Sequence, residues 1–68
     1  MKILSFTIRH EMLENLMCER RIAHLFKVED LGHARNHYRI VALVREEDYD
    51  AVAAHASDRP QPAEWPNH

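Results

Sequence analysis

Apolar and polar residues alternate along residues 2–9, KILSFTIR, so that Leu4, Phe6 and Ile8 share one side of an extended chain. Alternation of this kind, built from β-branched and aromatic residues, is typical of a β-strand. Ile3 lies on the other side of the same strand, which indicates that the second face is partly covered. We therefore predict a strand whose more apolar side faces the core.

Two later segments change to a helical period. Residues 10–20 carry an apolar stripe on one side of a predicted helix, formed by Met12, Leu13, Leu16 and Met17. Residues 46–57 open with four acidic residues, which suits the positive end of a helix dipole. The stripe of this second predicted helix is formed by Tyr49, Val52, Ala53 and Ala56.

A hairpin is predicted between the two helices. Residues 22–28 alternate again, with Ile22, His24, Phe26 and Val28 on one side, and residues 37–45 alternate in the same way. The segment between them is rich in turn-forming residues. Gly32 and Asn36, which tolerate positive φ, lie within it.

The predicted order is therefore β-α-β-β-α, an α+β fold. A right-handed crossover places the first strand beside the third, which gives a three-stranded antiparallel sheet with two helices on one face. This is a truncated ferredoxin-like unit that lacks its last strand. We expect one compact domain over 1–57 and an extended tail over 58–68, since three prolines fall in the last eleven residues. The strand at 2–9 is left with an open edge, and we expect it to pair with a second copy in a homodimer.

Composition narrows the class of protein. The chain has 68 residues, which is one domain, and its formal net charge of −2 provides no overall basic field for nucleic acid. Cys18 is the only cysteine, so no disulfide forms within one chain, and a lone thiol fits a reducing compartment. No apolar run is long enough to span a membrane. We therefore expect a cytoplasmic protein without a membrane partner.

Three segments resemble the PII-like and CutA-type small signalling proteins: SFTIRHEMLENLM, LGHARNHYR and IVALVREEDYDAVAA. The resemblance is one of pattern and covers roughly residues 3–56. It implies a ferredoxin-like architecture, a hairpin loop that carries function, and assembly into oligomers.

Histidine spacing suggests a metal site as an alternative to a protein without cofactors. Three residues separate His33 from His37, and imidazole ligands suit zinc or copper. The two histidines lie on either side of a predicted turn rather than on one helix face, so their spacing is weaker evidence for a metal site. Our first expectation is therefore a protein without a cofactor. Cys18, beside the apolar stripe, is expected to be a small buried residue.

Candidate contact residues for a protein partner fall in three places. The hairpin region contributes Arg35, His37 and Arg39, which are exposed on a loop or strand end where recognition usually lies. The start of the second helix contributes Glu46, Glu47, Asp48 and Asp50. The tail contributes Trp65, since an exposed tryptophan is a common interface anchor.

These observations favour a small non-enzymatic regulator or inhibitor that binds another protein. No serine lies in an elbow motif, and the short chain leaves little room for a deep catalytic pocket. Size and character associate it with phage- or plasmid-type anti-defence or host-modulating proteins. One alternative is a metal-responsive PII-like protein that uses the loop histidines. Another is a nucleic-acid-binding module through the basic hairpin, although acidic residues interleave with its cations.

Overall fold

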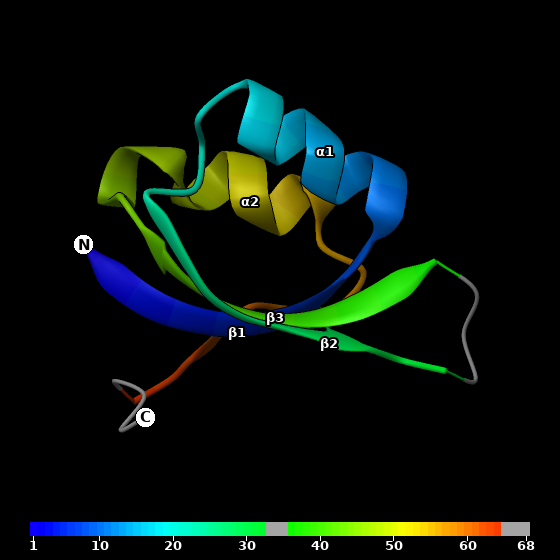
Figure 1. Ribbon diagram of the computed structural model, residues 1–68. Coiled ribbons are helices and arrows are strands. Elements are labelled where there is room, and N and C mark those ends of the chain that lie inside the picture. Colours follow the sequence, from blue (N-terminus) through cyan, green and yellow to red (C-terminus); the bar gives the residue numbers. More distant parts are fainter. Residues whose placement is uncertain (33–35, 65–68) are drawn as a thin grey trace.

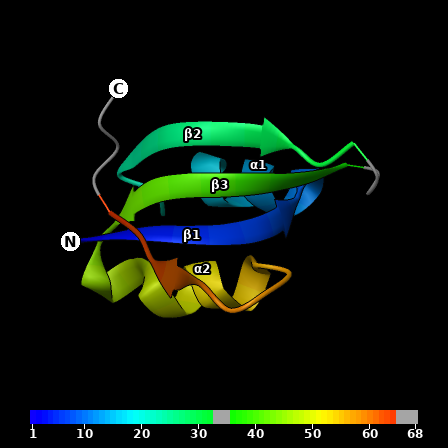
Figure 2. The same ribbon diagram turned by 90° about the horizontal axis from the view of Figure 1, so that it is seen from below.

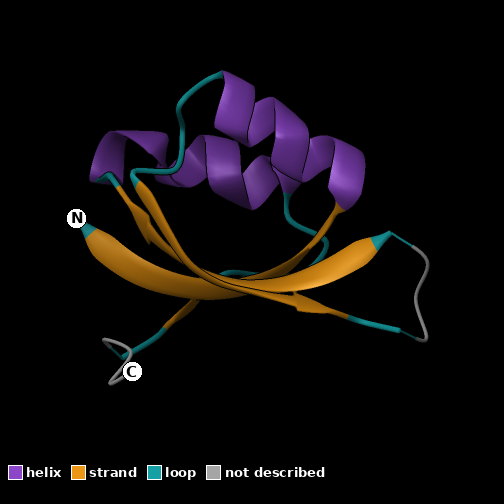
Figure 3. Cartoon of the chain, in the orientation of Figure 1, coloured by secondary structure: helices purple, strands orange, loops and turns teal. Residues whose placement is uncertain are grey.

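The computed structural model describes residues 1–32 and 36–64, and in these residues a four-stranded antiparallel sheet carries two α-helices (Figure 1). The strand order is β2-β3-β1-β4. Both helices lie on the same face of the sheet, and the other face is turned away from them (Figure 3). The prediction of an α+β fold with both helices on one face is therefore confirmed.

The centre of the sheet is formed by β1 (Lys2–Arg9) and β3 (His37–Val44), which run antiparallel with Phe6 opposite Ile40. Their alternation is strict because only one side chain in two points toward the helices. Six apolar residues on that side are at most 2% exposed: Leu4, Phe6, Ile8, Ile40, Ala42 and Val44. The predicted core side of residues 2–9 is thus confirmed.

The helices cover this side with short apolar stripes. Helix α1 (His10–Cys18) buries Leu16, and α2 (Tyr49–His55), which follows a 3₁₀ turn at Glu46–Asp48, buries Val52. Both helices are shorter than predicted. Met17 is 44% exposed, so the stripe of α1 is narrower than its sequence indicates.

Strand β2 (His24–Asp30) departs from the predicted alternation. Leu25 lies opposite Ala42 and Lys27 lies opposite Val41, so Phe26 is an extra residue in a β-bulge. A bulge shifts every later side chain by one position. The prediction that His24, Phe26 and Val28 share one face is therefore wrong, since Val28 lies opposite the buried Ile40.

The fourth strand corrects the predicted three-stranded sheet. Strand β4 (Gln61–Pro62) pairs antiparallel with β1. Around it, the Ser57 amide donates to the Thr7 carbonyl at 2.8 Å, and the Ala63 amide donates to the Ile3 carbonyl at 2.9 Å. The predicted tail is therefore regular here, because proline is tolerated on a sheet edge where its missing amide is not needed. The edge of β1 that we expected to pair with a second copy is occupied by residues 57–63.

Candidate functional site

The face of the sheet opposite the helices is the candidate site, and Figure 2 looks onto it from below. In the part of the chain that the structure describes, no helix covers it. Side chains reach this face from β1 and β3 at the odd-numbered positions and from the bulge of β2. We define the open sheet face as Ile3, Ser5, Thr7, Phe26, Lys27, Arg39, Val41 and Leu43.

Cross-strand pairing arranges this face in rows. Ile3 of β1 lies opposite Leu43 of β3, and the next row along the strands contains Ser5 opposite Val41. Because the bulge places two residues against one, Phe26 and Lys27 both lie beside Val41. An apolar surface therefore runs across three strands.

The neighbouring row is polar. Thr7 lies opposite Arg39, and Arg39 in turn lies opposite Glu29 of β2. The open sheet face is thus divided into an apolar half near the start of β1 and a charged half near its end.

Burial distinguishes the apolar half from the core. Ile3, Phe26, Val41 and Leu43 are only half-buried, whereas the core residues of the two central strands, such as Phe6 and Ile40, are fully buried. The Phe26 ring packs edge-on against His24, with ring centroids 4.7 Å apart. Large apolar side chains that remain accessible as a contiguous group mark interaction surfaces more often than scattered ones do.

The predicted hairpin residues are only partly brought to this face. Arg39 lies on it, and half-buried His37 lies at its far end with Nε2 3.2 Å from Ser57 Oγ. Arg35 and His33 lie outside the described residues, so the predicted metal pair is not placed. Within residues 1–32 and 36–64, no three histidine, cysteine, aspartate or glutamate side chains come together as a metal site would require.

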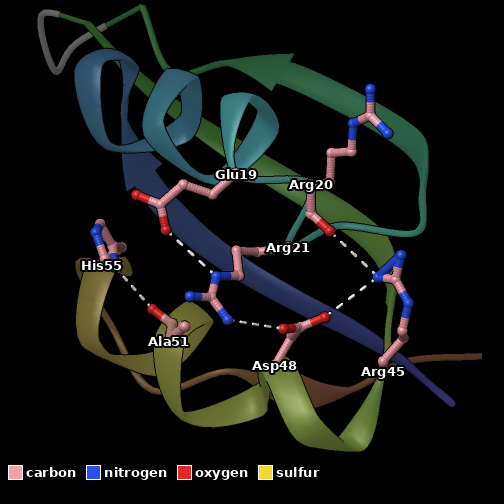
Figure 4. Close-up of polar contacts among 7 residues, drawn as sticks. All are labelled: Glu19, Arg20, Arg21, Arg45, Asp48, Ala51 and His55. Carbon is pink, nitrogen blue, oxygen red and sulfur yellow. Dashed lines mark hydrogen bonds and ion pairs between the residues drawn. The ribbon is translucent and has the colours of Figure 1, made fainter.

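The acidic residues predicted as a contact surface differ in how far they are buried. Glu46, Glu47 and Asp50 are exposed, whereas Asp48 is only 7% exposed. Figure 4 shows the Asp48 carboxylate between two guanidinium groups: Arg21 donates to Oδ1 at 3.1 Å and Arg45 donates to Oδ2 at 3.2 Å. Asp48 therefore belongs to an ion-pair cluster that joins the end of α1 to the start of α2, and it is not part of the exposed acidic surface.

The charge of Arg21 is favoured by this cluster. Its pKa is raised above the ordinary value, first by the hydrogen bond to Asp48 and next by the hydrogen bond to Glu19. A cation whose pKa is raised on folding stabilises the folded state at every pH below its ordinary value. The contribution of Arg21 is therefore complete at neutral pH and is lost only in strong alkali.

A cleft of about 320 Å³ lies beside this cluster, between the start of β1, the end of β3 and the start of α2. Two cations and two carboxylates line it together with apolar residues, so it has no dominant charge. The lining residues are Lys2, Leu4, Val44, Arg45, Glu46, Tyr49 and Asp50. Predicted contact residues Glu46 and Asp50 therefore lie at a cleft on the helix side, away from the open sheet face.

Two other reactive side chains, His10 and Cys18, lie at the two ends of α1. His10 contacts Glu14 one helical turn away, and its Nδ1 lies 3.2 Å from the Tyr38 hydroxyl. Cys18 is exposed rather than buried as expected. Trp65, the predicted anchor, lies outside the described residues, although Ala63 just before it is hydrogen-bonded to β1.

The open sheet face was not predicted as a site, although the apolar residues of the central strands gave an indication of it. Ile3, Val41 and Leu43 are apolar residues on the side of their strands that faces away from the core. A strand with apolar residues on both sides is buried or covered on both faces. The bulge that adds Phe26 to these residues leaves no mark in the sequence.

Within the described residues, neither helix is long and apolar enough to cross a membrane. No protein-family model matches the chain, and no significant match is found among curated proteins or solved structures.

Proposed function

We propose that this protein is a small non-enzymatic binding protein whose contact surface for another protein is the open sheet face. One observation carries the proposal: Ile3, Phe26, Val41 and Leu43 form an accessible apolar surface on the sheet face that the helices leave uncovered. Covering such a surface removes apolar area from water, which is the main driving force for protein association.

The composition of the face favours a protein over other ligands. An apolar centre with polar and charged residues at its margin is the usual anatomy of a protein interface. Here Lys27 and Arg39 flank the apolar centre, and Glu29 follows in the same row as Arg39. A regulator or inhibitor needs no more than such a surface on a rigid sheet, and a ferredoxin-like arrangement of the β-α-β-β-α order supplies one.

Selection of peptides from a random display library on the immobilised protein tests the proposal. Selected peptides are then compared on wild type and on Val41→Glu, which places a charge at the centre of the apolar surface. We expect binding to fall at least about tenfold, since an unpaired charge buried at an interface costs more than 1.4 kcal/mol. The melting temperature should change little, because Val41 lies outside the core.

Glu47→Lys is the matched control, since it also changes charge but lies on the exposed acidic surface at the start of α2. It should leave peptide binding unchanged. Peptides that bind Val41→Glu as well as wild type, or that lose binding only on Glu47→Lys, would overturn the assignment of the contact surface.

A second candidate function is single-stranded nucleic-acid binding on the same face. The bulge presents the Phe26 ring and the Lys27 ammonium together, and such a combination can stack a base and contact a phosphate. Glu29, which lies opposite Arg39, disfavours nucleic-acid binding because its carboxylate has the same charge as a phosphate. Oligonucleotide affinity that falls steeply with salt, and that Lys27→Ala reduces, would favour this function over protein binding.

A further inference from the structure

We propose that residues 65–68, which follow the described chain, dock on the apolar half of the open sheet face with Trp65 as their anchor, and that they compete there with the partner protein. The competition rests on the proposed function, whereas the docking of this segment is independent of it. The protein thus carries its own regulator of access to the contact surface.

The described C-terminal segment leads the chain to this surface. Near the end of β1 the Ser57 amide donates to the Thr7 carbonyl. Near its start the Ala63 amide donates to the Ile3 carbonyl at 2.9 Å. After β4 the chain crosses the start of β1 on the face opposite the helices, which Figure 2 shows from below. Residues 65–68 therefore continue from a point on the side of the open sheet face.

The row of side chains nearest to this crossing is within reach of Trp65. Ile3 lies opposite Leu43, and Leu43 lies opposite His24 of β2. Neighbouring strands are about 4.8 Å apart, and two extended residues span up to about 7 Å. The step from Ala63 to Trp65 is therefore long enough to pass over β1, and a tryptophan side chain there can contact Leu43.

The apolar half offers this side chain a matching surface. Ile3 and Leu43 are half-buried apolar residues that no described helix covers. Phe26 of the bulge has a further interaction besides its ring contact with His24, so the described contacts do not account for all of its surroundings. Aromatic rings gain from edge-to-face contact with one another as well as from the apolar area that they bury. Trp65 thus finds aliphatic and aromatic partners together.

The cleft on the helix side does not offer the same surface. Two cations and two carboxylates line it. In Figure 1 the described end of the chain lies on the opposite side of the sheet from both helices. An indole at position 65 therefore has the open sheet face before it, and the cleft lies behind the sheet.

A single anchor makes the docked segment displaceable. Contact of one indole with the face favours docking, whereas ordering the backbone of residues 65–68 opposes it. Because these effects have opposite signs, docked and undocked forms are both populated, and a partner that binds only the undocked form shifts the balance toward it.

The fluorescence of Trp65 tests the docking, because it is the only tryptophan of the chain. We expect the emission of the folded full chain to lie to the blue of that of the urea-unfolded chain. Leu43→Glu should shift it to the red while the circular dichroism spectrum stays that of the folded protein. Glu47→Lys, on the helix side, is the control and should leave the emission unchanged. Equal emission of the folded and unfolded chains, or no shift in Leu43→Glu, would overturn the docking.

Truncation tests the competition. A chain that ends at Glu64 keeps the contacts of residues 57–63 with β1, and Trp65→Ala removes the anchor alone. We expect both to bind the selected peptides at least about fivefold more tightly than wild type, since the docked fraction lowers the apparent affinity. Unchanged affinity would overturn the competition. If no peptide binds through Val41, the proposed function fails, and the Trp65 emission still decides whether the segment docks.

Discussion

The Arg21 guanidinium and the Asp48 carboxylate lie 3.1 Å apart, although the two residues are 27 positions apart in the chain. Arg45 donates to the other carboxylate oxygen of Asp48 and also to the backbone carbonyl of Arg20. The nearly buried Asp48 thus connects the loop after α1 with the start of α2. An exposed ion pair contributes little, but a carboxylate that accepts two charged hydrogen bonds while mostly buried contributes more.

Removal of this carboxylate should therefore lower stability. We expect Asp48→Ala to reduce the free energy of unfolding by about 1–2 kcal/mol, or roughly 5–10 °C in melting temperature for a domain of this size. Thermal denaturation followed by circular dichroism measures the change. Asp50→Ala is the matched control, because Asp50 is an exposed acid two residues later, and it should shift the melting temperature by far less. Equal shifts for the two variants would mean that the cluster does not stabilise the junction.

The backbone conformation at the end of α1 gives a second prediction about stability. Arg20 has a φ of +57°, and the amides of Arg20 and Arg21 donate to the carbonyls of Met17 and Leu16. This is the capping arrangement in which glycine is preferred at the left-handed position. We expect Arg20→Gly to be more stable than Arg20→Ala by about 1 kcal/mol, since alanine keeps the left-handed strain that glycine lacks.

Urea denaturation of these two variants isolates the backbone effect, since both lose the arginine side chain and both keep the carbonyl that Arg45 contacts. Should alanine prove equal to glycine, the left-handed conformation at this position would not cost the protein stability.

The sequence was most informative where side chains alternate without interruption. The central strands and their core side were predictable, because burial of one side chain in two leaves a period that can be read directly, as Leu4, Phe6 and Ile8 illustrate. Phe26 was misplaced because a bulge depends on how two strands pair rather than on either strand alone.

The other departures also depend on contacts between distant segments. The four acidic residues at the start of the second helix look alike in sequence, and only the approach of Arg21 from the loop after α1 distinguishes Asp48 from the others. The pairing of Gln61 and Pro62 with β1 was missed because proline is a poor strand residue except at an edge.

The C-terminal segment should protect the edge of β1. The Thr7 amide donates to the Asp58 carboxylate at 2.7 Å, Pro60 is buried, and β4 pairs with Leu4 and Ser5. A chain that ends at Ser57 loses these contacts. We expect it to be less stable by roughly 1–3 kcal/mol and to aggregate more readily, because backbone groups of an edge strand become available.

A chain that ends at Glu64 keeps the same contacts and provides the comparison. Hydrogen exchange should show the Thr7 amide protected in the longer chain and at least about tenfold faster in the shorter one, since its acceptor is lost. Equal exchange rates would show that the C-terminal segment does not hold this edge.

Substitution by leucine should mainly lower stability at one phenylalanine of the chain and mainly weaken binding at the other. Phe6 is fully buried beneath the helices, whereas half-buried Phe26 lies on the open sheet face. We expect Phe6→Leu to lower the free energy of unfolding by about 1–2 kcal/mol, because it leaves unfilled volume in a close-packed core. Phe26→Leu should lower it by less than about 0.5 kcal/mol, a change typical of residues outside the core.

Both substitutions should be measured by urea denaturation at a low protein concentration, so that any self-association does not contribute to the apparent stability. The order should reverse for the binding of peptides selected on the open sheet face: Phe26→Leu should weaken it, and Phe6→Leu should leave binding by the folded protein unchanged. If Phe26→Leu instead destabilises the monomer as much as Phe6→Leu does, Phe26 belongs to the core of the single chain, and the apolar surface proposed for the partner would lose its largest member.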